Sequence, residues 1–70
     1  MFFKKGIADG LLKEALITRE NLAEELGYPL KHVSAVLDGE AEAGEELTLL
    51  LLSAFGDEVM DDAIDWQRMK

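Results

Sequence analysis

The 70-residue sequence has no cysteine and contains only one histidine and one proline. Without cysteine there is no disulfide framework, no thiolate zinc site and no thiol nucleophile. One histidine cannot build a metal centre alone. A chain without cysteine suits a reducing cytoplasm. We therefore expect a cytoplasmic protein with no metal site and no cofactor.

Long apolar runs are lacking as well. The opening residues MFFKKG contain too short an apolar run for a signal peptide, and no segment approaches the roughly 18 apolar residues of a membrane span. We expect one soluble domain over residues 1–70. A chain of this length buries only about 60% of the surface that it exposes when unfolded, so its core is marginal and homodimerisation is expected.

Basic residues are scarce: 7 Lys and Arg stand against 15 Asp and Glu, which gives a formal net charge of −8. Non-specific nucleic-acid binding depends on basic side chains that displace counterions. The composition therefore argues against such binding unless the charges are segregated locally. Lys4 and Lys5 form the densest positive cluster, either as an ordinary solvated terminus or as an arm that contacts phosphate.

The segment 18–39 is the functional candidate, because it reads as two short helices joined by a tight turn. Thr18 is suited to cap the first helix and Gly27 to end it. Pro29 lies where a second helix would begin, and Gly39 ends that helix. A helix-turn-helix, whose second helix can enter a DNA major groove, has this plan. A helical hairpin in any small bundle would give the same pattern.

Helical spacing of apolar residues predicts three further helices. One covers residues 7–16. A second covers residues 45–55, is apolar nearly all round, and is expected at the centre of the fold. The last, over residues 57–70, is an amphipathic helix and a candidate dimerisation surface, although Trp66 can equally pack on the core. The residues predicted to form the dimer interface are Val59, Met60, Ala63, Ile64 and Trp66. Together the segments predict an all-α fold, a compact five-helix bundle with a helix-turn-helix.

Three motifs carry a resemblance to a known family: LAEELG at 22–27, VSAVLDG at 33–39, and AFG at 54–56. With the order of helices around them, residues 11–66 resemble the Cro/XRE helix-turn-helix family. Within that family the chain looks most like small phage and antitoxin-type regulators, a group that includes anti-CRISPR-associated repressors. The resemblance implies a phage-repressor-like domain that dimerises and reads a palindromic operator in double-stranded DNA.

The resemblance also implies roles for individual residues. Arg19 falls where the family commonly contacts phosphate, and Lys31 falls where a side chain can donate to guanine O6 and N7. Tyr28 lies in the turn, where its hydroxyl can reach the DNA backbone. The full set of predicted DNA-binding residues is Arg19, Tyr28, Leu30, Lys31, His32, Ser34 and Ala35. Helical spacing also directs Leu30 inward, so for that residue a core position competes with a base contact.

Two departures from the family weaken this assignment. Asp38 stands where the family often has Asn, and Glu40 where it often has Lys or Arg, so both carboxylates would repel phosphate. An alternative function is therefore kept: an acidic protein-binding module that mimics DNA, neutralises a toxin, or inhibits a basic host protein. An enzyme is not expected, because His32 has only Ser34 nearby and residues two apart on a helix do not face each other.

Overall fold

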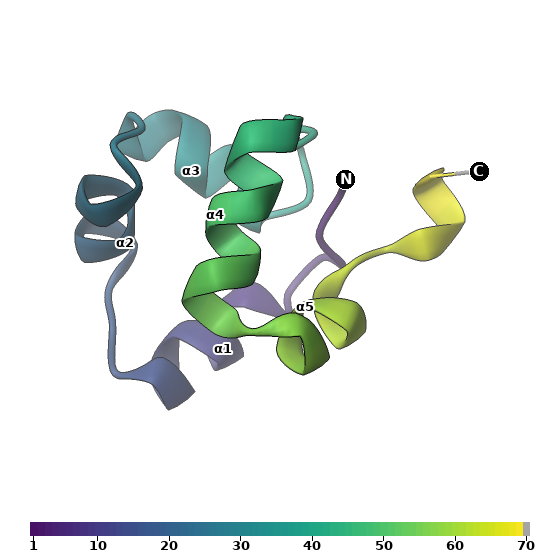
Figure 1. The fold of residues 1–70 in the computed structure, drawn as a ribbon, viewed down its shortest axis with the longest axis horizontal. Helices are drawn as coiled ribbons and strands as arrows, with labels where there is room; N and C mark the ends of the chain where they lie inside the picture. The colour runs from purple at the N-terminus through teal and green to yellow at the C-terminus, as the bar shows by residue number, and fades with distance from the viewer. Residues whose placement is uncertain (70) are drawn as a thin grey trace.

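A computed structural model describes residues 1–69 of the chain. These residues form five α-helices and one short 3₁₀ helix (Figure 1). The elements are α1 (Ala8–Ala15), α2 (Arg19–Leu26), α3 (Leu30–Leu37), α4 (Glu45–Phe55), α5 (Asp57–Ala63) and η1 (Trp66–Met69). The predicted all-α class with five helices is confirmed. None of the described helices is long and apolar enough to cross a membrane.

The ends of α2 follow from its local sequence. The Thr18 hydroxyl accepts a hydrogen bond from the Asn21 backbone N–H at 3.1 Å, which satisfies an amide of the first turn. Gly27 ends α2 in the left-handed conformation, with φ of 75°. Pro29, with φ of −60°, directly precedes α3 and fixes its entry. The predicted pair of helices with a short turn is thus present between residues 18 and 38.

The core is formed by apolar side chains from the N-terminal segment and from all five α-helices. Figure 1 shows α4 crossing the middle of the molecule, with α2 and α3 on one side and α5 on the other. Leu47 and Leu51 of α4 are buried, whereas Leu49 is 58% exposed. The structure does not support the predicted central position of this helix, because only Leu47 and Leu51 of its 11 residues are buried.

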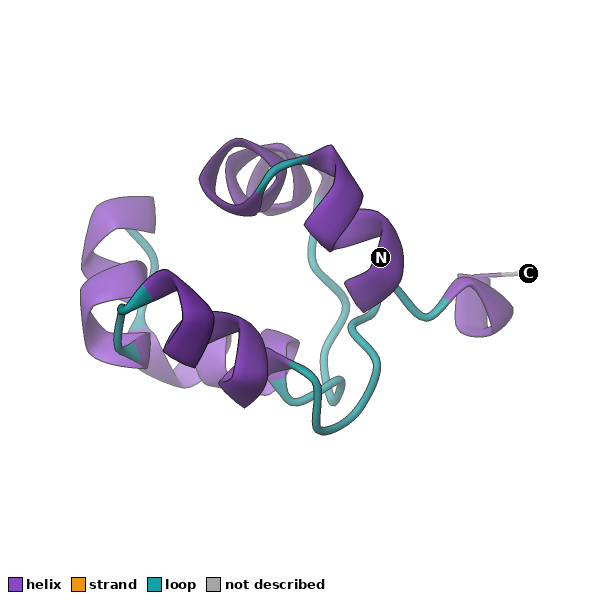
Figure 2. Ribbon diagram, turned by 90° about the horizontal axis from the view of Figure 1, so that it is seen from below, coloured by secondary structure: helices purple, strands orange, loops and turns teal. Residues whose placement is uncertain are grey.

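The predicted single helix over residues 57–70 is wrong. The α5 helix ends at Ala63, and Ile64 is extended with ψ of 133°. Ile64 forms an antiparallel bridge with Phe3, and the Lys4 and Asp65 backbone N–H groups donate to the Ala63 and Phe2 carbonyls, each at 2.8 Å. Because pairing with the N-terminal segment satisfies these backbone groups, the chain leaves the helix there. Figure 2 shows η1 at one edge of the molecule, beyond the loop that follows α5. Residue 70 lies outside the described residues.

Gly39 is the point at which three distant segments meet. Its φ is 77°, and a Cβ atom added to it would lie 2.6 Å from the Phe3 carbonyl oxygen. Arg68 donates a hydrogen bond to the Gly39 carbonyl, and its guanidinium carbon lies 3.9 Å from the centroid of the Phe2 ring. The end of α3, the N-terminal segment and the segment after α5 are therefore held together around a residue without a side chain.

Candidate nucleic-acid interface

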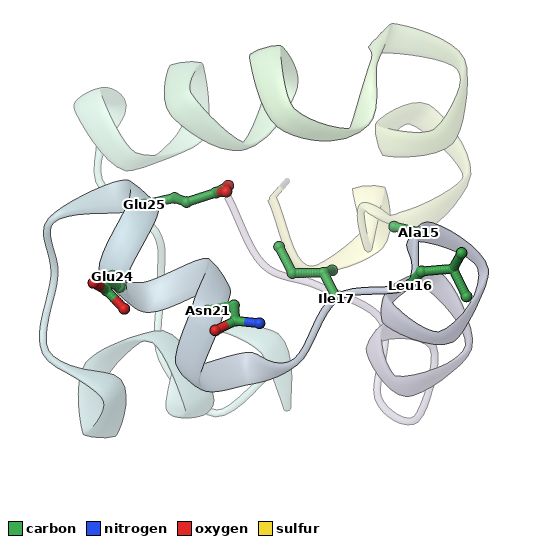
Figure 3. Close-up of a pocket in the computed structure, with 6 residues that line it drawn as sticks. All are labelled: Ala15, Leu16, Ile17, Asn21, Glu24 and Glu25. Atoms are coloured by element: carbon green, nitrogen blue, oxygen red, sulfur yellow. The ribbon is translucent and has the colours of Figure 1, made fainter.

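An open hollow of about 520 Å³ lies between the end of α1 and one face of α2 (Figure 3). We call it the α1–α2 groove; its lining residues are Ala15, Leu16, Ile17, Asn21, Glu24 and Glu25. The charged side chains of its lining are those of Glu24 and Glu25. Among the described residues, no group of three or more His, Cys, Asp or Glu side chains is arranged to hold a metal ion.

The α3 helix differs from its neighbours in charge. Its sequence, LKHVSAVL, contains no Asp or Glu, whereas each of the other four α-helices within the described residues contains at least two. Lys31 and His32 of α3 are both exposed. Among the α-helices of the described residues, α3 is therefore the one without a carboxylate of its own.

The predicted readout residues divide between the exposed side of α3 and its flank. Lys31 and His32 are exposed, Leu30 is 40% exposed, and Ser34 and Ala35 are half-buried. The inward-facing residues are Val33, Val36 and Leu37, which are all buried. The inward direction that helical spacing gave Leu30 is wrong, because the side chain at the first position of α3 lies at the rim of the core.

The first turn of α3 is suited to an anion. The N–H groups of its first three residues have no acceptor within the helix, and their dipoles point outward. No side chain caps this end of α3. His32 is stacked with Tyr28 of the preceding turn, with ring centroids 5.9 Å apart and ring planes 27° apart. Phosphate is a ligand that such a helix end accommodates, and Lys31 adds a positive charge.

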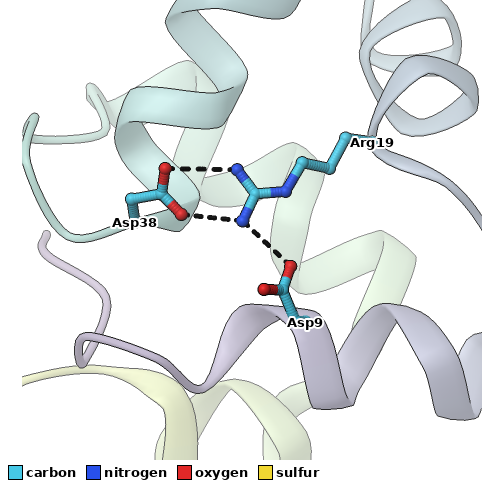
Figure 4. Close-up of polar contacts among 3 residues, drawn as sticks. All are labelled: Asp9, Arg19 and Asp38. Carbon is cyan, nitrogen blue, oxygen red and sulfur yellow. Dashed lines mark hydrogen bonds and ion pairs between the residues drawn. The ribbon is translucent and has the colours of Figure 1, made fainter.

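Arg19, the predicted phosphate contact, is engaged within the chain (Figure 4). Its Nη2 lies 2.7 Å from Asp38 Oδ1 and 2.9 Å from Asp9 Oδ1, and its Nη1 lies 3.2 Å from Asp38 Oδ2. These hydrogen bonds from Arg19 hold the pKa of the Asp38 carboxyl below its usual value and raise the pKa of the guanidinium. Arg19 thus links α2 to α1 and to the end of α3.

This arrangement changes the interpretation of both charges. Asp38 was expected to repel phosphate, yet its charge is balanced by Arg19 in a bidentate pair. Arg19 in turn is not available as an unpaired positive charge. The sequence offered no signal for the third partner, Asp9, because it lies ten residues away on another helix. Arg19 is better described as a residue that positions α3.

Lys4 and Lys5 are exposed, and the backbone beside them is held by the fold. Phe3 is buried in the core, and the Lys4 backbone N–H is bonded to Ala63. The Lys5 side chain lies beside Gly39, just beyond the end of α3, whereas Lys31 is in the first turn of that helix. The Lys5 side chain therefore starts near the C-terminal end of α3, roughly 10 Å along the helix axis from the turn that carries Lys31.

The predicted dimer interface needs correction at three of its five residues. Met60, Ala63 and Ile64 are buried in the chain's own core, so their side chains cannot contact a second copy. They face inward because α5 packs beside α4 and then joins the bridge to Phe3. Val59 is half-buried, and Trp66 is 51% exposed, with Nε1 donating to the Asp61 carbonyl at 3.1 Å. Only these two remain accessible to a partner.

The chain matches no family model, no curated protein and no solved structure. The resemblance to the Cro/XRE family therefore remains an interpretation of its motifs. What can be argued about function depends on the geometry and charge of the chain itself.

Proposed function

We propose that the protein is a sequence-specific DNA-binding regulator of the cytoplasm, in which α2 and α3 act as a helix-turn-helix. The observation that carries the proposal is the charge of α3: in a chain of net charge −8, this helix has no acidic residue and exposes Lys31 and His32. The leading form of the proposal is a repressor or autorepressor of a small phage or mobile-element operon.

In this proposal the first turn of α3 enters the major groove. Lys31 donates to guanine O6 and N7, and Leu30 contacts a thymine methyl group. His32, stacked on Tyr28, approaches a phosphate, as do the unpaired N–H groups at the helix end. Ser34 and Ala35 are half-buried and contribute at the edge of the contact.

The dimensions of the chain favour a dimer for this task. Its longest extent is 31 Å, whereas the centres of two half-sites lie about 34–36 Å apart along the DNA. One copy therefore presents one α3 helix to one half-site, and a palindromic operator requires two copies. Val59 and Trp66 are the predicted interface residues that stay accessible for the contact between copies.

The test compares two lysines that differ in position but not in charge. Lys31→Ala removes the proposed contact, and Lys13→Ala removes an exposed lysine of α1. Each protein is titrated by fluorescence anisotropy against the duplex upstream of its own gene, at two salt concentrations. We expect Lys31→Ala to weaken binding by about tenfold or more and to lower the salt slope by about one. Lys13→Ala should change the affinity much less.

Equal losses for the two variants would mean that binding follows net charge rather than α3. No binding by the folded wild-type protein at low salt would overturn the proposal. Arg19→Ala is unsuitable as a test of DNA contact, because it breaks the link to Asp9 and Asp38 and so disturbs the position of α3.

A second function, binding of a basic protein, is favoured by a separate observation. The charge of Arg19 is neutralised by two carboxylates of the chain, while exposed acids occupy α1, α2, α4 and α5. Such a surface attracts a basic partner and steers its approach. Its test is a binding assay with a basic partner in the presence of duplex DNA, and a complex that duplex DNA leaves intact would support it.

A further inference from the structure

Leu16 is placed unfavourably in two respects. It ends α1 in the left-handed conformation, with φ of 57° and ψ of 42°, and it is the only non-glycine residue with positive φ within residues 1–69. Glycine is the usual residue at such a helix end, because a Cβ atom is strained there. The Leu16 side chain is also 93% exposed, so it gains almost nothing from burial. Neither feature stabilises this chain, and the side chain is free to contact something outside it.

The position of Leu16 suggests where that contact lies. Leu16 stands on the rim of the α1–α2 groove, beside Ala15 and Ile17, and its side chain points outward from the end of α1, away from α2 (Figure 3). A second hollow, of about 220 Å³, shares Ala15 and is lined by Leu11, Phe55 and Val59 among others. Half-buried and exposed apolar groups therefore continue around the end of α1, which offers an apolar strip to a partner.

The charges around this strip specify the partner. Glu24 and Glu25 line the α1–α2 groove, and Glu14 lines the second hollow. No Lys, Arg or His lines either one. A partner that contacts the strip thus meets carboxylates in both hollows. Charge complementarity therefore favours a basic partner segment at this strip.

We propose that the α1–α2 groove docks a short basic amphipathic helix of another protein. Apolar side chains of that helix cover Leu16 and Ile17, and its Lys or Arg side chains pair with Glu24 and Glu25. This docking mode is the helix-in-groove type. It goes beyond the proposed DNA contact, because no residue of α3 takes part, and it gives the proposed binding of a basic protein a location.

The key variant is Leu16→Gly, because it removes the exposed side chain and leaves a residue that suits the left-handed conformation. The probe is a fluorescein-labelled helical peptide with leucines along one face and lysines along both edges. We expect Leu16→Gly to weaken its binding by about tenfold, as loss of an interface anchor does. The matched control is Leu49→Ala, which removes another exposed leucine from outside the groove and should leave the affinity within about twofold.

A second pair of variants separates the groove acids from net charge. Glu24→Gln with Glu25→Gln is compared with Glu40→Gln with Glu58→Gln, which lowers the negative charge equally at exposed positions outside the groove. We expect the groove pair to weaken peptide binding by about tenfold and the other pair by about twofold or less. Amide shifts in NMR spectra should change on peptide addition at residues 15–17 and 21–25.

Three results would overturn the inference. The first is equal weakening by Leu16→Gly and Leu49→Ala. The second is a pattern of amide shifts spread over α4 and α5 instead of the groove. The third is concentration-dependent self-association that Leu16→Gly abolishes, which would assign the groove to a second copy. Titration of Leu16→Gly with duplex DNA distinguishes DNA binding through α3 from peptide docking in the groove. If the variant binds DNA as the wild type does but no longer binds the peptide, both proposals are supported.

Discussion

The outer face of α3 and the α1–α2 groove lie on one small molecule and differ in nearly every respect. The α3 face carries Lys31 and His32 without an acid, whereas the groove carries Glu24 and Glu25 without a base. A net charge of −8 thus agrees with the acidic groove but does not describe the α3 face. Net charge alone therefore cannot exclude DNA binding, and the charge of each surface has to be considered separately.

The two surfaces also differ in how the chain supports them. The α3 face is backed by three buried residues and fixed by the Arg19 pair with Asp38. The groove is bordered by an exposed leucine in a strained backbone conformation. Contacts within the fold thus stabilise the α3 face, whereas the Leu16 side chain at the groove adds no stability to the fold. Both involve α2, which packs against α3 and lines the groove.

The largest loss of stability is expected from a substitution in the core beneath α2, because α2 contributes to both surfaces. Leu22 of α2 is almost completely buried, and Leu22→Ala should lower the free energy of unfolding by about 2–5 kcal/mol. A chain of this size has roughly 3–10 kcal/mol in total, so both binding activities should fall together. Urea denaturation followed by circular dichroism measures the loss. Asn21→Ala, at the exposed neighbouring position, is the control. Loss of only one activity would show that the surfaces do not depend on a common core.

A substitution at Leu16 is expected to change stability by a smaller amount and in the opposite direction. Leu16→Gly should raise the free energy of unfolding by about 0.5–1 kcal/mol, because relief of the left-handed strain exceeds the entropy that glycine adds to the unfolded chain. Thermal and urea unfolding measure the change. A variant that is more stable yet binds the peptide less well would sharpen the contrast between the surfaces. A destabilised variant would instead mean that the Leu16 side chain supports the fold.

The smallest change in stability is expected from breaking the ion pair between Arg19 and Asp38. Asp38 is 45% exposed, so Asp38→Asn should cost only about 0.5 kcal/mol at neutral pH. Because Arg19 lowers the pKa of Asp38 in the folded chain, this stabilisation is present above the unfolded pKa of about 3.9. It is lost as the pH falls through the lower folded pKa. Unfolding free energies at neutral pH and near pH 2 should therefore differ less for the variant than for the wild type. Equal differences would contradict this role of the pair.

The parts of the fold that were predictable from the sequence depend on nearest neighbours in the chain. Thr18 and Gly27 mark the two ends of α2 at the positions where the structure has them. Capping and left-handed termination involve residues only a few positions apart, so they can be recognised without knowledge of the fold. The exposed part of α3 was predictable for the same reason, since helical spacing separates Lys31 and His32 from the buried valines.

What could not be predicted depends on contacts between distant residues. The bridge from Phe3 to Ile64 ends α5 early and joins positions at opposite ends of the chain. Arg19 and Asp38 pair across 19 residues, and no spacing rule distinguishes that contact from an exposed arginine. Met60 and Ala63 occupy the apolar side of an amphipathic helix, and periodicity cannot say whether that side covers the chain's own core or a second copy.

Gly39 has a consequence for how this sequence can change over generations. A position in a short connection between helices is ordinarily free to vary, because loops tolerate substitution better than helices do. Here any side chain would collide with the Phe3 carbonyl and separate the three segments that meet there. Gly39 should therefore be among the positions that tolerate substitution least during evolution, whereas the exposed acidic residues should vary more freely.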